Sequence, residues 1–114
     1  MKSEHIIYRL KRARETYIDA DYLFQRGSTN SSVNRLYYAA FYATIALFLY
    51  YNLEVKSHKS VKQKLGKDFV LKGLISKEEA KVFSILSDYR HKGVIEYLFK
   101  PVQDYIDRIE ELLK

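Results

Sequence analysis

The sequence predicts an all-α protein folded as a helical bundle. Apolar residues recur at spacings of three and four along most of the chain, which is the period of an α-helix, and strand-like alternation is nearly absent. The chain has only four glycines and one proline, and they lie far apart. Its 114 residues suffice for one hydrophobic core. We therefore expect a single domain over residues 1–114, built from four long helices and one short one.

The first helix is predicted from one continuous apolar stripe near the N-terminus. Its members alternate between spacings of four and three: Ile6, Leu10, Ala13, Tyr17, Ala20 and Phe24. Gly27 is expected to end this helix, because glycine readily adopts the left-handed conformation that often follows a helix C-terminus. Residues 28–32 then supply several N-cap candidates for the next helix.

The second helix contains the most unusual stretch of the chain, residues 36–51, in which Thr44 is the one polar side chain apart from five tyrosines. The stretch is shorter than the roughly 20 apolar residues that a membrane-spanning helix needs. On a helical wheel it has a mostly small face: Leu36, Ala39, Ala40, Ala43, Ala46 and Leu47. The opposite face is bulky: Tyr38, Phe41, Tyr42, Ile45, Phe48 and Leu49. A helix that is apolar all round must be covered all round. It is therefore a central core helix, or one of its faces serves a subunit interface.

The third predicted helix is short. It follows a basic connector and extends from about His58 to Leu71, weakened by Gly66 and closed near Gly73.

Two more helices are predicted in the C-terminal third. Ser76 and Glu79 have the spacing of a capping box, which favours a helix start, and this helix is expected to reach residues 90–91. Pro101 suits the first turn of a last helix that ends near Leu113.

Composition narrows the setting and the chemistry. Twenty Lys and Arg against fourteen Asp and Glu give a formal charge of +6, which favours polyanionic partners at low salt. Cysteine is absent, so the chain has no disulfide framework and no thiolate zinc site. The charged N-terminus shows no secretory signal, and we expect a soluble, cytoplasmic protein.

Basic residues concentrate in the connector and the short helix. Those we take as candidate contacts to RNA or a nucleotide, here and farther along the chain, are Lys56, His58, Lys59, Lys62, Arg90 and Lys92. Lysines and arginines on such a surface gain from the release of counterions when they meet phosphates. A solvated helix face with no ligand is the alternative interpretation.

A second candidate site centres on Arg90, His91 and Tyr97. Arg90 extends the apolar stripe of its helix, so it needs a partner, and its planar guanidinium suits phosphate or carboxylate. His91 has the intrinsic pKa range of a general acid or base. Arg90 could equally pair with an acidic neighbour or cap the helix C-terminus. The three histidines match no zinc spacing and the glycines form no phosphate loop, so we expect no metal site and no cofactor.

These features together resemble a known family, the small prokaryotic HEPN domains, and within it an uncharacterised stand-alone group with a YYAAFYA core. The segments that carry the resemblance are Tyr37–Ala43, Ser57–Lys59 and the region around Arg90. The resemblance covers nearly the whole chain. It implies an up-and-down bundle of four or five helices that forms a two-fold dimer.

The resemblance also implies a biological setting. Many members are encoded beside a minimal nucleotidyltransferase as a toxin–antitoxin pair, and active members are metal-independent ribonucleases. Arg90 matches the arginine of their motif and His91 the polar residue after it. The motif histidine would fall five or six residues after Arg90, where this chain has Ile95 and Glu96, followed by Tyr97.

Three functional hypotheses follow. The first is a homodimeric module that binds RNA or a nucleotide, or docks a nucleotidyltransferase. The second is an endoribonuclease toxin that uses Arg90 and His91, with Tyr97 as a further catalytic candidate. The third is a non-catalytic interaction protein. For the dimer we expect the bulky face of the second helix to form the interface, through Tyr38, Phe41, Tyr42 and Ile45.

Overall fold

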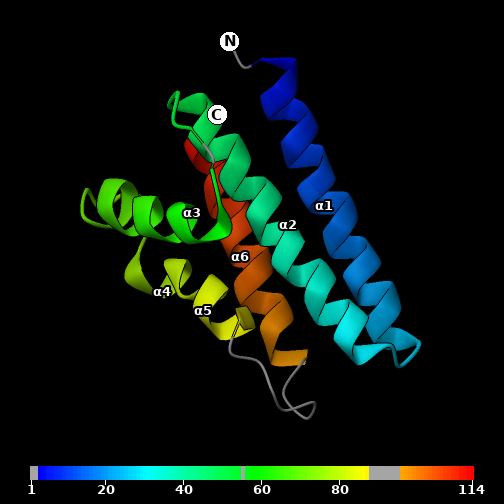
Figure 1. Ribbon diagram of the computed structural model, residues 1–114. Coiled ribbons are helices and arrows are strands. Elements are labelled where there is room, and N and C mark those ends of the chain that lie inside the picture. The colour runs from blue at the N-terminus through cyan, green and yellow to red at the C-terminus, as the bar shows by residue number, and fades with distance from the viewer. Residues whose placement is uncertain (1–2, 55, 88–95) are drawn as a thin grey trace.

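The computed structural model describes residues 3–54, 56–87 and 96–114, in which helices pack side by side (Figure 1). In chain order they are α1 (Glu4–Gln25), α2 (Thr29–Tyr50), α3 (His58–Lys64), the π-helix η1 (Leu65–Val70), α4 (Lys77–Ala80), α5 (Val82–Ser87) and α6 (Glu96–Leu112). The described residues contain no strand, and the predicted all-α class is confirmed.

The long helices α1 and α2 form an antiparallel pair that is in contact along most of its length (Figure 1). Both contribute small, fully buried side chains: Ala13, Thr16 and Ala20 from α1, and Ser32, Ala39, Ala40, Ala43 and Ala46 from α2. Small side chains let two helix axes approach closely. The Ser32 hydroxyl also donates to the carbonyl of Ala20 across the pair, at 2.7 Å. The expected small-residue face of the second helix is therefore a helix-packing face.

The connection between α1 and α2 is short because Gly27 reverses the chain. Gly27 has φ +88° and its N–H bonds to the carbonyl of Phe24, while the N–H of Ser28 bonds to that of Leu23. This pair of bonds satisfies carbonyls that the helix end leaves open. The prediction that Gly27 ends the first helix is confirmed.

The core lies where α6 crosses the α1–α2 pair. The apolar stripe of α6 is buried at Leu98, Val102, Tyr105, Ile106 and Ile109. Arg14 of α1 also contacts α6: its guanidinium donates hydrogen bonds to the carboxylates of Asp107 and Glu110.

The third predicted helix is divided into two kinds of helix. The α-helix α3 passes at Leu65 into η1, whose wider turn is closed by a bond from the N–H of Leu71 to the carbonyl of Gly66, at 3.2 Å. Gly73 then ends the segment with φ +76°, as expected.

The fourth predicted helix starts as expected but is interrupted. Ser76 and Glu79 form the capping box, with each side chain bonded to the other's backbone N–H at 3.0 and 2.8 Å. A turn at Lys81 separates α4 from α5.

The prediction that Pro101 opens the last helix is wrong. α6 begins at Glu96, with Pro101 inside it. A proline in this position removes one backbone hydrogen bond. Leu98 is 6% exposed and belongs to the same stripe as Val102, so burial of the first turn outweighs the local cost of the proline.

No helix in the described part of the chain has the length and apolar character needed to cross a membrane.

Candidate nucleic-acid interface

An exposed histidine, His58, lies against a cluster of aromatic rings from α2. The centroid of its imidazole is 4.3 Å from that of Phe41, 5.4 Å from Tyr37 and 5.9 Å from Tyr38. The Tyr37 ring is nearly parallel to the imidazole, at 19°, whereas the Tyr38 ring meets it edge-on, at 78°. We call these four residues the His58 cluster. The stacked rings hold the imidazole in place and leave His58 open to solvent.

The start of α3 sets the position of His58. Ser57 is the N-cap, and its hydroxyl accepts from the N–H of Ser60 at 3.1 Å. The Ser60 hydroxyl accepts from the N–H of Ser57, also at 3.1 Å, which completes a capping box. His58 is thus the first residue of a helix whose start is fixed by two reciprocal bonds.

A hydrogen bond joins Tyr37 to His58. The Tyr37 hydroxyl lies 2.8 Å from Nδ1 of His58. Burial raises the pKa of the Tyr37 hydroxyl and the neighbouring Tyr38 raises it further, so Tyr37 keeps its proton. Either group can be the donor, depending on the tautomer of the imidazole. Where Nδ1 accepts from Tyr37, Nε2 carries the hydrogen and is a donor.

Two lysines beside His58 are suited to phosphate contacts. Lys56 and Lys59 are exposed, and the one described ion pair of Lys56, with Glu54, is long at 3.9 Å between two well-exposed side chains. Such a pair contributes little. Lys64, by contrast, donates to the carbonyl of Glu54 at 3.0 Å. We therefore do not count Lys64 among the candidate phosphate contacts. Lys62 is exposed but engaged with a neighbour, and we retain it as a charge on the same surface.

Arginines extend this surface along α2 and α1. The guanidinium carbon of Arg35 lies 5.1 Å from the ring centroid of Tyr38, and that of Arg12 lies 5.7 Å from the centroid of Tyr42. Each contact combines a cation with a partly exposed ring. Alternating rings and cations of this kind are suited to single-stranded nucleic acid, whose bases stack and whose phosphates need positive charge.

The second predicted site falls mainly outside the described residues. Arg90, His91 and Lys92 belong to residues 88–95 and have no structural description here. Tyr97, in the first turn of α6, is 70% exposed, and no described contact joins it to the His58 cluster. The chain does bring α5 to this cluster, because the ring of Phe83 meets that of Tyr37 at 5.6 Å.

The residues expected at the dimer interface occupy different environments. Phe41 is 8% exposed, and His58 stacks on it. Tyr38, Tyr42 and Ile45 are half-buried and pack against the core. Part of the bulky face of α2 is therefore covered by α3 of the same chain, and the interface itself stays a prediction.

Sequence reasoning did not select two residues of this surface, Tyr37 and Arg35. Tyr37 is 21 positions from His58, and no local spacing links the two. Arg35 precedes Tyr38 by three positions, the spacing of neighbours on a helix, and this pattern could have revealed the contact.

The described surface offers groups that suit ligand binding: ring faces, an exposed imidazole and several cations. In the described part of the chain, no group of three or more His, Asp or Glu side chains is arranged to hold a metal ion.

Comparison with known proteins relates the chain to a described family and to a bacterial protein. A model of the family described as "HEPN domain" matches residues 7–114. A protein of Thermotoga maritima described as "UPF0332 protein" is 34% identical over 116 residues, covering 98% of this chain and 88% of that protein.

Proposed function

This chain belongs to the HEPN domain family, and from that premise we propose that it acts as a homodimeric module that binds single-stranded RNA through the His58 cluster. The observation that supports the proposal is the exposed imidazole of His58, stacked on Phe41 and Tyr37 and flanked by Lys56 and Lys59. A base could stack beside the imidazole while the lysines meet the adjoining phosphates.

Charge and ring geometry favour RNA over an acidic protein as the partner. An acidic protein would use the cations alone, whereas this surface also offers the exposed imidazole of His58 beside the ring of Tyr37, and neither residue is among those expected at the dimer interface. Stacking on an aromatic side chain is worth about 1–3 kcal/mol per base. By the family resemblance we also propose that a minimal nucleotidyltransferase is encoded with this protein and acts on or with it as part of a toxin–antitoxin pair.

The test is the binding of a fluorescent single-stranded RNA, measured by anisotropy over a range of salt concentrations. Replacement of His58 by Ala removes one stacking surface and should weaken binding by about 5- to 100-fold. Lys59→Glu should weaken binding at low salt and flatten the salt dependence, because fewer counterions are released. The matched control is Lys77→Glu, the same charge change at an exposed position on α4.

Two results would contradict RNA binding at this surface. One is an affinity that does not depend on salt. The other is an equal loss in Lys59→Glu and Lys77→Glu. A shortened RNA after incubation with the wild-type protein would instead favour the ribonuclease alternative based on Arg90 and His91.

A further inference from the structure

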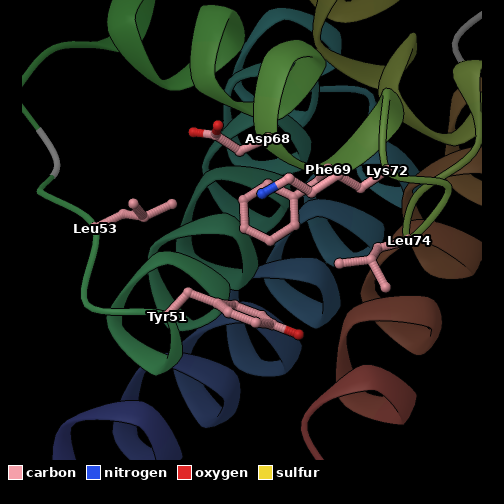
Figure 2. A pocket seen from close by; sticks show the side chains of 6 residues that line it. All are labelled: Tyr51, Leu53, Asp68, Phe69, Lys72 and Leu74. Carbon is pink, nitrogen blue, oxygen red and sulfur yellow. The ribbon is translucent and has the colours of Figure 1, made fainter.

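A small pocket opens between the end of α2 and the η1 segment, and no residue of the His58 cluster lines it (Figure 2). Its volume is about 250 Å³, and its lining residues are Tyr51, Leu53, Asp68, Phe69, Lys72 and Leu74. This volume lies just below the range of about 300–1,000 Å³ typical of sites for drug-sized ligands. It suits a molecule with one ring or one branched side chain.

Two opposite charges line the pocket without neutralising each other. Asp68 and Lys72 are four positions apart, but Asp68 belongs to the π-helix η1 and Lys72 to the turn after it, so the pairing that this spacing favours on an α-helix does not apply. In the described part of the chain neither has a hydrogen bond or an ion pair. By contrast, Lys100 and Asp104, also four apart, do pair at 2.8 Å. The two charges of the pocket are thus available to a ligand.

The remaining walls are aromatic and aliphatic. The ring of Phe69 is backed by Phe48 at 5.6 Å and meets the ring of Tyr51 edge-on at 5.4 Å. Tyr51 is 41% exposed, and in Figure 2 its ring lies across the pocket from Asp68, Phe69 and Lys72. Leu53 and Leu74 stand on either side in the same view. A cation entering here would find a carboxylate and aromatic faces, and an apolar group would find the leucines.

The backbone that carries Asp68 and Phe69 is itself unusual. Both belong to the π-helix η1 (Leu65–Val70). Such helices are rare and occur frequently at functional sites. The pocket and the π-helix are independent observations at the same place in the chain.

We propose that this pocket binds a small zwitterion, an α-amino acid with an aliphatic or aromatic side chain. Its ammonium group pairs with Asp68 and its carboxylate with Lys72, while its side chain packs against Tyr51, Leu53 and Leu74. The two charges of the pocket sum to zero, which matches a zwitterion and disfavours a nucleotide with its multiple negative charges. This site is separate from the RNA surface, so either proposal can fail without the other.

The test is a titration of the isotope-labelled protein with L-leucine and L-phenylalanine, followed by NMR chemical shifts. We expect saturable shifts confined to the amides of residues 51–53 and 68–74. The N-acetyl and the amide derivatives each lack one charge and should bind at least fivefold more weakly. Adenosine monophosphate should not compete.

Variants separate ligand binding from loss of structure. Asp68→Asn and Lys72→Gln should each weaken amino-acid binding at least fivefold, with unchanged helical circular dichroism. The matched control is Lys67→Gln, an exposed neighbour that does not line the pocket and should bind as the wild type does. The proposal is overturned if neither amino acid gives saturable shifts, if the nucleotide binds here instead, or if both pocket variants bind normally.

Discussion

Thr44 and Tyr105 make a polar contact inside the core, between α2 and α6. Both residues are fully buried, and their hydroxyl oxygens lie 2.6 Å apart. Thr44 also donates to the carbonyl of Ala40 at 2.8 Å, so Tyr105 donates to Thr44. Thr44 is the one polar side chain of residues 36–51 apart from the tyrosines. It therefore accepts the hydrogen bond of a buried phenol from α6. Thr16, also buried, has a hydroxyl oxygen without a hydrogen-bond partner among the described residues.

The same substitution should have opposite effects at these two threonines. Thr44→Val leaves the buried Tyr105 hydroxyl without an acceptor and should lower the free energy of unfolding by about 1–3 kcal/mol. Thr16→Val removes a buried polar group that has no partner among the described residues, and should raise the free energy of unfolding by about 1 kcal/mol. Urea unfolding of both variants beside the wild type measures the two changes. Losses of equal size in the two variants would contradict the hydrogen-bond argument.

Tyr105 should also make the fold sensitive to alkali. Burial raises the pKa of its hydroxyl. The unfolded tyrosine has its ordinary pKa of about 10. The contribution of Tyr105 to stability is therefore complete below pH 10 or so, and is lost as the pH rises through the higher pKa of the folded state.

We expect Tyr105→Phe to lose less stability than the wild type between about pH 10 and pH 12. Urea unfolding at several pH values, followed by circular dichroism, gives the dependence, and tyrosinate absorbance reports the titration itself. Parallel curves for the two proteins would show that Tyr105 is not the group responsible.

At the scale of elements, three helical segments end in the same way. Gly27, Asn52 and Gly73 have φ of +88°, +59° and +76°. In each case the N–H of the following residue bonds back to a carbonyl in the last turn, as from Leu74 to Phe69 at 3.0 Å. Left-handed residues therefore set the lengths of α1, α2 and η1.

Two glycines in one segment should respond oppositely to alanine. Gly73→Ala forces a side chain into the left-handed region and should destabilise the protein by about 1–2 kcal/mol. Gly66 lies within η1, and a Cβ added there would have no atom within 4 Å. Gly66→Ala should therefore stabilise the protein by about 0.5–1 kcal/mol. Thermal unfolding of the two variants is the measurement. A stabilised Gly73→Ala protein would be incompatible with the observed turn.

Local signals predicted the elements better than they predicted contacts between them. The stripe of α1, the capping box at Ser76 and the end of a helix at Gly27 depend on neighbours in sequence, and each is found in the structure. The start of α6 was mispredicted because Pro101 is a local signal, whereas the burial of Leu98 depends on distant helices.

The sequence identified only part of the candidate site, because its other contacts join residues that are far apart in the chain. His58, Lys56 and Lys59 stood out as part of a basic segment. The contact of His58 with Tyr37 depends on how the start of α3 lies against α2, and no periodicity encodes it.

At the scale of the whole molecule, exposed apolar side chains remain after the core is formed. On α1 they include Ile7, Ile18 and Tyr22, with exposures of 55%, 58% and 76%. On α2 the half-buried Tyr38, Tyr42 and Ile45 form the face that we propose for the dimer. The two faces lie on different helices, so substitutions can distinguish them.

The proposed dimer should have a mass near twice 13.5 kDa in solution at micromolar concentration. Tyr42→Arg introduces a charge at the α2 face and should shift the mass toward the monomer, while Tyr22→Arg on α1 should leave it unchanged. Light scattering after size-exclusion chromatography gives the mass, and circular dichroism verifies that both variants fold. Dissociation by Tyr22→Arg alone would place the interface on α1.

The small buried residues between α1 and α2 have a consequence for conformational entropy. Ala13, Ala20, Ala39, Ala43 and Ala46 have no side-chain rotamers to lose when the two helices come together. Ordering this pair is therefore opposed by backbone entropy but hardly by side-chain entropy at these positions. The flexible side chains of both helices are left to the outer faces, where they keep their freedom until a partner orders them.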